Sequence, residues 1–334
     1  MKRILSLLVV AFSFQAMAQT DINNILAAGL NDAEKFTTDY ISPASEGILY
    51  SMSNGWYNTA DAKPLAGFEI SIIGNMASFK NKDDKKAFQL NTADYENLQF
   101  VDGSNTKLVS TALGDIEGVR VFVEDENGLF REEFDLPSGL AAEGINFVPT
   151  GFVQASVGII KATELKARFL PKIKSEDFGM SMYGFGIQHE FTKHLPADKV
   201  LPIAISGVIG FTHLDASYDF TNTGVVAGQD QRLEIKADTW VFQAVVSTRL
   251  PIINFYGGLG YLSGKSTTDV LGTYIVQSGP VQATYVDPFA VAKKASGVTA
   301  NLGAKLKLGF FRLHADYVLA EFNTFSFGVN FGFR

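Results

Sequence analysis

The last ten residues of the chain alternate between bulky apolar side chains and small or polar ones. Phe or Val occupies every odd position from 325 to 333, and Ser, Gly, Asn, Gly and Arg occupy the even positions. Successive side chains of a strand point to opposite faces, so residues 325–334 predict a strand with one apolar and one polar face. A strand of this kind is typical of the barrels of bacterial outer membranes.

The same period of two recurs from Leu65 onward and predicts an all-β chain. Short connections, such as 161–162, alternate with long ones, such as 221–230 and 274–295. This arrangement predicts an antiparallel up-and-down barrel of about ten strands, or about 12 to 14 if the less regular regions hold further hairpins. The expected strands are 65–79, 149–160, 163–174, 178–191, 202–220, 231–250, 253–273, 296–308, 310–321 and 323–334.

Three of these strands carry charged side chains at alternate positions. Because lipid cannot form hydrogen bonds, charged residues of a membrane-spanning strand are expected to face the lumen. The residues concerned are Glu164, Lys166, Arg168, Lys172, Glu234, Lys236, Asp238, Arg312, His314 and Asp316. The pattern therefore predicts a transmembrane barrel, formed by residues 65–334, with a polar lumen of mixed charge.

The N-terminal residues predict export from the cytoplasm. Lys2 and Arg3 precede the short apolar run 4–14, and Ala16-Met17-Ala18 is a typical cleavage site. We interpret residues 1–18 as a signal peptide, because its apolar run is too short to span a membrane. A cleaved signal peptide followed by a polar-lumen barrel places the protein in the bacterial outer membrane.

Residues 19–64 are expected to precede the barrel as a separate segment. Apolar residues at helical spacing predict a helix over 20–42 that ends at Pro43, followed by irregular backbone. Two positions are open for it, a small periplasmic helix outside the barrel and a plug inside the lumen. In the second case Trp56, Tyr57 and Asn58 are expected to line a ligand pocket between plug and wall.

Residues 80–148 are the least regular part of the chain. They are charged and rich in turn residues, with short β-prone pieces such as 119–123. We expect a long extracellular excursion that contains one extra hairpin.

Composition argues against several classes of function. The chain has 28 Lys and Arg against 35 Asp and Glu, and its net charge of −7 argues against a nucleic-acid partner. It has no Cys, so it offers no disulfide or Cys nucleophile. His314 and Asp316 have the residue types of a hydrolytic site, but lumen salt bridges explain them more simply. We expect no enzyme activity, no metal and no cofactor.

Two glycine-rich stretches, 184–186 and 257–260, superficially resemble nucleotide-binding loops. Neither is followed by a helix, which the nucleotide-binding motifs require. Glycine within a strand more often allows a bend or the close approach of an aromatic neighbour, and we interpret these glycines in that way.

Five segments carry a resemblance to known proteins. They are Asn54–Ala60, Leu165–Lys174, Tyr183–His189, Tyr256–Tyr261 and Leu313–Tyr317. Together they resemble a family of uncharacterised outer-membrane proteins of Bacteroidetes-type bacteria, a domain of unknown function, which implies a barrel but no particular activity.

A helix and a Gly/Asn-rich segment ahead of the first strand resemble, more loosely, the outer-membrane transporters of long-chain fatty acids and aromatic hydrocarbons. Those barrels are closed by an N-terminal hatch with an Asn-Pro-Ala motif. This chain departs from them, because it carries Asn58-Thr59-Ala60, without proline and later in the sequence.

The combined expectation is a plugged outer-membrane channel for small hydrophobic or amphipathic molecules. The alternative is a structural or adhesive barrel that acts through its extracellular loops without transport. In both cases the expected partners are outer-membrane lipid and the barrel-assembly machinery, which would bind the C-terminal strand 325–334.

Overall fold

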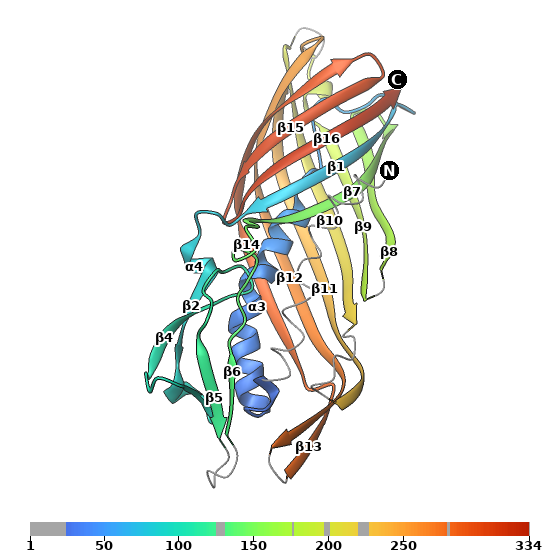
Figure 1. The fold of residues 1–334 in the computed structure, drawn as a ribbon. Coiled ribbons are helices and arrows are strands. Elements are labelled where there is room, and N and C mark those ends of the chain that lie inside the picture. The colour runs from blue at the N-terminus through green and yellow to red at the C-terminus, as the bar shows by residue number, and fades with distance from the viewer. Residues whose placement is uncertain are drawn as a thin grey trace.

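The protein is described here by a computed structural model covering residues 25–124, 131–175, 177–196, 201–219, 227–278 and 281–333. The expected signal peptide 1–18, the first residues of the predicted helix and Arg334 lie outside these ranges. Within them, the main feature is an antiparallel sheet that closes into a barrel (Figure 1). Its strands are β1 (Phe68–Ser78), β7 (Phe147–Ile160), β8 (Thr163–Lys174), β9 (Phe178–Glu190), β10 (Ile203–Asp219), β11 (Ala227–Thr248), β12 (Ile253–Ser278), β14 (Phe289–Leu308), β15 (Phe311–Leu319) and β16 (Asn323–Phe333).

Neighbouring strands pair in chain order, and the ring closes between the first strand and the last. β1 pairs with β7 on one side and with β16 on the other, while β11 pairs with both β10 and β12. The predicted up-and-down barrel is therefore confirmed, with ten strands in its wall among the described residues. The C-terminal strand has the expected facing, because Phe325 and Phe327 are exposed while Ser326 is buried.

The prediction of a long loop over 274–295 was wrong. β12 continues to Ser278 and forms a hairpin with β13 (Val281–Val286), and β14 begins at Phe289. The paired residues Thr273 and Val286 belong to this additional ladder. Most of this stretch is therefore regular strand. As a result, β11, β12 and β14 extend well beyond the other strands at one end of the barrel (Figure 1).

The outer wall of the barrel is apolar, as a lipid-facing surface must be. Along β1, for example, Ile70 and Ile72 are exposed while Ser71 is buried. The same apolar outer face runs around the wall and defines a transmembrane barrel. Its outward residues include Val153, Leu165, Phe169, Phe185, Ile187, Ile209, Trp240, Phe242, Phe255, Leu259, Tyr261, Val298, Leu302, Tyr317, Leu319 and Phe325. The lumen is polar only in part, because inward wall residues such as Val208 and Val241 pack in an apolar core with the helix described next.

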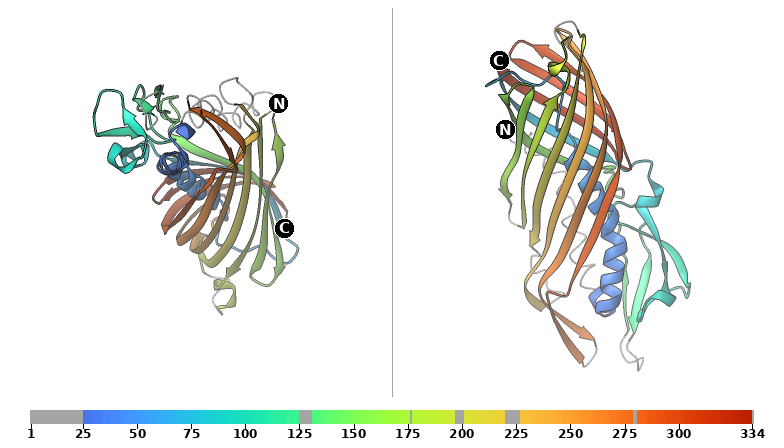
Figure 2. Two further views of the ribbon diagram at one scale, coloured as in Figure 1. Left: turned by 90° about the horizontal axis from the view of Figure 1, so that it is seen from below. Right: turned by 180° about the vertical axis from the view of Figure 1, so that it is seen from behind.

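A long helix, α3 (Leu30–Ser53), occupies the inside of this wall. It contacts β1 and β7 on one side of the ring and β10, β11, β12 and β14 on the opposite side. Its C-terminal half is buried in the lumen, and its N-terminal half lies between the long strands and a separate layer of short strands (Figure 2). The lumen position, one of the two alternatives left open by the sequence, is therefore the one observed.

The prediction that Pro43 ends the helix was wrong, because Pro43 lies inside α3. Proline in a helix interior costs about 3 kcal/mol, since it removes one hydrogen bond and crowds the preceding turn. Leu49, Tyr50 and Met52 follow it and are at most 2% exposed. Burial of large apolar side chains stabilises by about 1.5–3 kcal/mol each, which is enough to continue the helix through the proline.

The excursion, here residues 79–146, forms two small sheets instead of one hairpin. Its elements are α4 (Asp83–Lys86), β2 (Ala87–Asn91), η2 (Thr92–Asp94), β3 (Leu98–Phe100), β4 (Thr106–Ser110), β5 (Arg120–Glu124) and β6 (Arg131–Asp135). β2 pairs with β4, and β5 pairs with β3 and β6. Phe36 of α3 packs in one core with Leu98 and Val121 of the excursion and with Tyr274 of β12. The excursion therefore covers the half of α3 that extends beyond the complete ring.

The two ends of the barrel differ. At one end, here called the extended end, lie the excursion, the hairpin of β12 and β13 and the start of α3 (Figure 1). At the other, the short-turn end, the connections are brief, as at 161–162 and 309–310, and β9 leads to β10 through the short helix η3 (Thr192–His194).

Candidate functional site: a plug inside the barrel

Residues 54–66, here called the plug segment, leave α3 and cross the lumen to the start of β1. Asn54 ends the helix in an extended conformation, and Gly55 follows with a φ of 81°, which favours glycine. Trp56, Tyr57 and Asn58 are 1%, 5% and 8% exposed. The three residues expected between plug and wall are thus buried there, in contact with different parts of the wall.

Trp56 packs against a buried arginine of β8. The guanidinium carbon of Arg168 lies 3.5 Å from the centroid of the Trp56 ring and 4.2 Å from that of Phe152. Arg168 also donates hydrogen bonds to the carbonyl of Met52 at 2.9 Å and to Gln154 Oε1 at 3.1 Å. A single charged wall residue therefore holds both the end of α3 and the aromatic ring that follows it.

Glycines in the wall make room for the plug aromatics. A Cβ at Gly186 or Gly210 would lie 2.6 or 2.3 Å from the Trp56 ring, and one at Gly258 would lie 2.6 Å from Tyr57 Oη. These distances are far below ordinary contact, so no larger residue fits without displacing the plug. For Gly186 and Gly258, which belong to the two glycine-rich stretches, the predicted close packing of an aromatic neighbour is confirmed.

Tyr57 connects the plug to the opposite side of the wall. Its hydroxyl donates to Asn301 Oδ1 at 2.6 Å, and its ring meets the Tyr256 ring edge-on with centroids 6.0 Å apart. Tyr256 in turn donates to Asp316 Oδ2 at 2.8 Å. Asp316 is therefore engaged by a tyrosine, not by His314.

Glu69, at the start of β1, is the next wall residue that binds the plug segment. Its carboxylate accepts hydrogen bonds from Asn58 Nδ2 at 2.9 Å, from Lys305 Nζ at 3.0 Å and from Arg312 Nη1 at 2.6 Å. Lys63 Nζ lies 3.9 Å away. Lys305 also donates to Asn58 Oδ1 at 2.7 Å, which ties the plug side chain into the ion pairs.

Two further wall carboxylates hold the last part of the plug segment. Glu164 accepts from the backbone N–H of Lys63 at 3.1 Å and from its Nζ at 3.2 Å, and it also pairs with Lys166. Glu190 accepts from the backbone N–H of Ala62 at 2.6 Å and pairs with Lys193 at 3.0 Å. Backbone groups of the plug are thus fixed by carboxylates of β8 and β9.

Serine hydroxyls complete the contacts on the remaining side. Ser247 lies 3.1 Å from Thr59 Oγ1 and accepts from the backbone N–H of Ala60 at 2.9 Å, and Ser206 donates to the Ala60 carbonyl. From Asn58 to Lys63, the plug segment is therefore held mainly by hydrogen bonds and ion pairs. The apolar side chains of the preceding residues, from Leu49 to Tyr57, belong to the apolar core.

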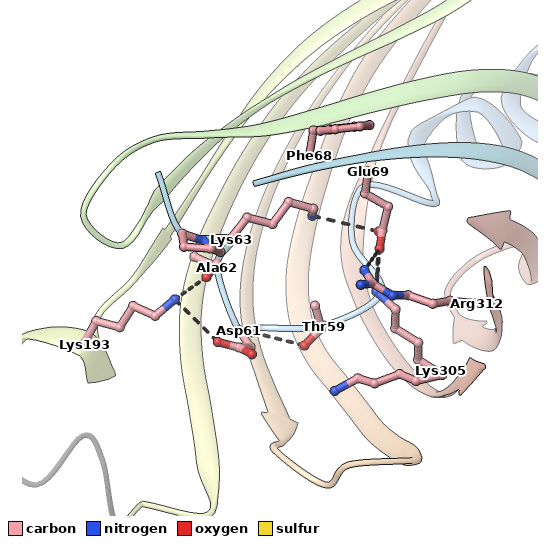
Figure 3. A pocket seen from close by; sticks show the side chains of 11 residues that line it. Thr59, Asp61, Ala62, Lys63, Phe68, Glu69, Lys193, Lys305 and Arg312 are labelled. Carbon is pink, nitrogen blue, oxygen red and sulfur yellow. Dashed lines mark hydrogen bonds and ion pairs between the residues drawn. The ribbon is translucent and has the colours of Figure 1, made fainter. Parts of the chain in front are cut away.

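A pocket of about 250 Å³ opens beside these contacts at the short-turn end (Figure 3). Both the plug segment and the wall line it, and cationic side chains predominate. Its lining residues are Thr59, Asp61, Ala62, Lys63, Pro64, Phe68, Glu69, Lys193, Lys305, Lys307 and Arg312.

Six of the predicted lumen residues face inward as expected. These are Glu164, Lys166, Arg168, Arg312, His314 and Asp316, all of which contact plug or lumen groups. The expected salt bridge between His314 and its neighbours is not the contact observed. His314 Nδ1 lies 2.9 Å from Asn330 Nδ2, while Arg312 pairs with Glu69.

The other four predicted lumen residues lie elsewhere, and their prediction was wrong. The side chains of Lys236 and Asp238 are 54% and 50% exposed on the outer face of β11, where Glu234 pairs with Lys236. This part of β11 extends beyond Trp240 and the apolar wall, so charged residues can face outward into water. Lys172 is exposed beside an irregularity in the pairing of β8 with β9 that disturbs the alternation.

Several important residues escaped the sequence analysis. Glu69, Glu190, Ser247 and Lys305 occupy inward positions on their strands, like the residues that were recognised. Glu69 is the only Asp, Glu, Lys or Arg of β1, and Glu190 is the only one of β9. Ser247 is uncharged, and Lys305 alternates only with Lys307, so the run of alternating charges that marked β8 is missing. Lys63 lies in irregular backbone, where periodicity gives no information.

Within the described ranges, no helix is both long enough and apolar enough to span a membrane. The same ranges contain no group of three or more His, Cys, Asp or Glu side chains arranged to hold a metal ion.

The fold and the lumen contacts define a transmembrane β-barrel that contains its own N-terminal plug. The chain belongs to a family of unknown function, DUF6588, which matches residues 1–333. No curated protein matches it.

Solved structures with detectable similarity include several barrels. Ail, the attachment invasion locus protein of Yersinia pestis, is 10% identical, with 81% of this chain and 100% of that chain covered and a TM-score of 0.26. The outer membrane transporter YddB from Escherichia coli is 9% identical over 77% and 39%, with a TM-score of 0.32. The translocator domain of autotransporter NalP from Neisseria meningitidis is 12% identical over 80% and 88%, with a TM-score of 0.27. Similarities this weak carry no argument about function.

Proposed function

We propose that this protein is an outer-membrane channel for small hydrophobic or amphipathic molecules, closed by its own plug segment. This proposal rests on a change in the type of contact between plug and wall along the plug. The apolar side chains of residues 49–57 pack in an apolar core, whereas 58–63 are held mainly by carboxylates, serines and lysines of the wall. A net hydrogen bond contributes about 0.5–1.5 kcal/mol, or about 1.5–3 kcal/mol when one partner is charged, because water or a solute can replace the partner. The polar part of the plug can therefore separate from the wall without exposing a large apolar surface.

The outer-membrane location rests on three supports. Along the strands, outward apolar residues alternate with inward residues, many of them polar, as in the barrels of that membrane. The N-terminal residues have the pattern of a signal peptide. The ring is closed by pairing of the first strand with the last, so the spanning sheet has no open edge.

A reversible covalent lock tests whether the plug acts as a gate. Thr59 on the plug and Ser247 on the wall have side-chain oxygens 3.1 Å apart, and the native chain has no Cys to interfere. The double variant Thr59→Cys/Ser247→Cys is expected to form a disulfide. In planar bilayers under conditions that open the wild-type barrel, such as an applied voltage, we expect the oxidised variant to stay closed and the reduced variant to conduct.

The matched control places a disulfide in the wall alone. Ser263 of β12 and Ser296 of β14 are paired and exposed on the outer face, so Ser263→Cys/Ser296→Cys does not touch the plug. Its conductance is expected to be the same before and after reduction. Equal conductance of the oxidised and reduced plug variants would contradict gating by this segment.

A second function, surface interaction, is favoured by one specific observation. The excursion is a folded layer with its own buried residues, such as Leu98, Phe100 and Val109, and is more than a simple connection. If it serves only to bind a partner, a strain lacking the protein should keep all its solute-uptake phenotypes. Loss of growth on one amphipathic carbon source would support the channel instead.

A further inference from the structure

The pocket at the short-turn end lies beside a buried cluster with an excess of positive charge. The cluster contains four cations, Lys63, Lys166, Lys305 and Arg312, whose side chains are 12%, 4%, 3% and 19% exposed. It contains two carboxylates, Glu69 and Glu164, which are 2% and 1% exposed. Two positive charges are therefore left without a carboxylate within the cluster.

Neighbouring carboxylates do not remove this excess. Glu190 already pairs with Arg249 and Lys193, and Asp61 lies 3.4 Å from the same lysine. Asp316 is hydrogen bonded to Tyr256. Lys307 also lines the pocket.

Burial of unbalanced charge is costly, because the lost hydration is not repaid by an opposite charge. Within the cluster, three cations share the carboxylate of Glu69: Arg312 lies 2.6 Å away, Lys305 3.0 Å and Lys63 3.9 Å. Arg312 Nε is buried without a hydrogen-bond partner. These groups need additional acceptor oxygens, and the pocket that Lys63, Lys305 and Arg312 line offers about 250 Å³ for them.

We propose that this pocket binds an oxyanion with two negative charges, of the phosphate-monoester class. Such an anion supplies the two missing charges, and its three free oxygens can accept from a guanidinium and from ammonium groups together. The Thr59 hydroxyl and the backbone of 59–63 lie along the same pocket. The binding step stands independently of the proposed channel.

A coupling between anion binding and release of the plug rests on the proposed function. An anion that takes over Arg312 and Lys305 weakens their hold on Glu69 and on Asn58, and both residues belong to the plug contacts. The phosphate end of an amphipathic solute would thus be recognised at the point where the plug is attached.

Calorimetric titration with inorganic phosphate at pH 8 tests the site, using the refolded full-length protein in a non-ionic detergent at constant ionic strength. We expect one saturable site in the wild type. Arg312→Gln is expected to bind at least about tenfold more weakly, since a hydrogen bond to a charged group contributes about 1.5–3 kcal/mol. Glu69→Gln is expected to bind more tightly, because it removes the competing carboxylate and raises the positive excess.

Arg232→Gln is the matched control, because Arg232 pairs with Glu234 away from the pocket. It should bind phosphate as the wild type does. Folding of every variant is followed by heat-modifiable gel migration, and Lys63→Gln, expected to bind weakly, replaces any variant that fails to fold. The absence of saturable binding to the folded wild type, or unchanged affinity in Glu69→Gln, would overturn the proposal.

Two competitors distinguish the source of the phosphate group. Displacement by glycerol phosphate alone indicates a soluble solute, and displacement by short-chain phosphatidic acid alone indicates a lipid headgroup. Both results support the site, while displacement by neither contradicts it. Phosphate binding is measured by titration of the wild type, and gating by the conductance of the disulfide variant, so either proposal can fail without the other.

Discussion

At the scale of single residues, the position of the plug depends on glycines in the wall, which leave room for its aromatic side chains. Trp56 fits only because Gly186 and Gly210 leave space on adjacent strands. Arg168 then covers the ring from a third direction. The wall and the plug are therefore complementary at particular positions, and small changes there should be measurable.

Gly210→Ala should displace Trp56, because the added Cβ would lie 2.3 Å from its ring. Overpacking of this kind costs about 1–3 kcal/mol. The chain has two Trp, so a Trp240→Phe background leaves Trp56 as the only indole. We expect its fluorescence to shift to the red and the midpoint of heat unfolding to fall.

Gly74→Ala is the control, because a Cβ at Gly74 meets nothing within 4 Å. It should leave both the emission and the unfolding midpoint unchanged. A Gly210→Ala protein with unaltered emission would show that the plug adjusts easily and is not seated as described.

The sequence could indicate these residues only in part. Trp56, Tyr57 and Asn58 were expected against the wall, and they are buried there, although their binding of a ligand stays a prediction. The pairing of Asn58 with Glu69 and Lys305 could not be derived. It joins positions far apart in the chain, and only the closed barrel brings them together.

At the scale of secondary-structure elements, α3 is the clearest case of tertiary contacts overriding a local signal. Pro43 correctly marks a weak point of the helix, since it cannot donate to the preceding turn. The helix nevertheless continues, because the residues after Pro43 pack in the lumen core. The sequence alone does not show how much apolar surface that core buries. The strands were easier to predict, because contact with lipid requires an apolar residue at every second position of the wall.

Pro43→Ala should strengthen the plug helix. Alanine restores the missing N–H and has the best helix propensity, so we expect about 1–3 kcal/mol of added stability. The measurement is hydrogen exchange of the amides of 44–50, which should slow. Thr38→Ala on the same helix serves as the control, and faster exchange in Pro43→Ala would mean that a bend at proline is needed for packing.

The joint between the plug helix, the excursion and the loop after β15 is ionic. Lys82 and Lys85 lie 3.2 and 3.5 Å from Glu321, and Lys85 lies 3.0 Å from Glu46 of α3. The hydrogen bond from Lys82 holds the pKa of Glu321 below its ordinary value of 4.5. Burial lowers the pKa of Lys85, but its bonds to Glu46 outweigh this effect and raise it.

The lowered pKa of Glu321 sets the direction of a pH effect. A carboxyl group whose pKa falls on folding stabilises the fold fully above its unfolded pKa and loses this contribution as pH drops through the folded value. We therefore expect the excursion to become more sensitive to an acid-active protease below about pH 4.5. Glu321→Gln should show the increased sensitivity already at neutral pH, whereas Glu143→Gln, at an exposed turn, should not.

At the scale of the whole molecule, the excursion is an addition to the barrel. Its two ends meet, because the Phe79 N–H donates to the Asn146 carbonyl at 3.0 Å. Replacement of residues 80–145 by Asn-Gly should therefore leave a folded barrel with heat-modifiable migration. The same change uncovers Phe36 and Ala33 of α3, so that the N-terminal half of the helix should exchange amide hydrogens rapidly.

This variant also separates the two candidate functions. A channel should keep its solute uptake after the replacement, whereas an adhesive barrel should lose its partner binding. A protein that no longer folds would instead show that the excursion is part of the barrel's own stability.

The position of the plug has a consequence for assembly. The chain enters the lumen at the extended end and leaves it at the short-turn end before β1 begins, and β1 makes its final pairing with β16. We therefore expect the C-terminal half of α3 and the plug segment to be enclosed before the first and last strands meet. Contacts between such distant segments form slowly. The N-terminal segment can act as a template around which the wall is completed, so that each molecule is sealed from the moment it is made.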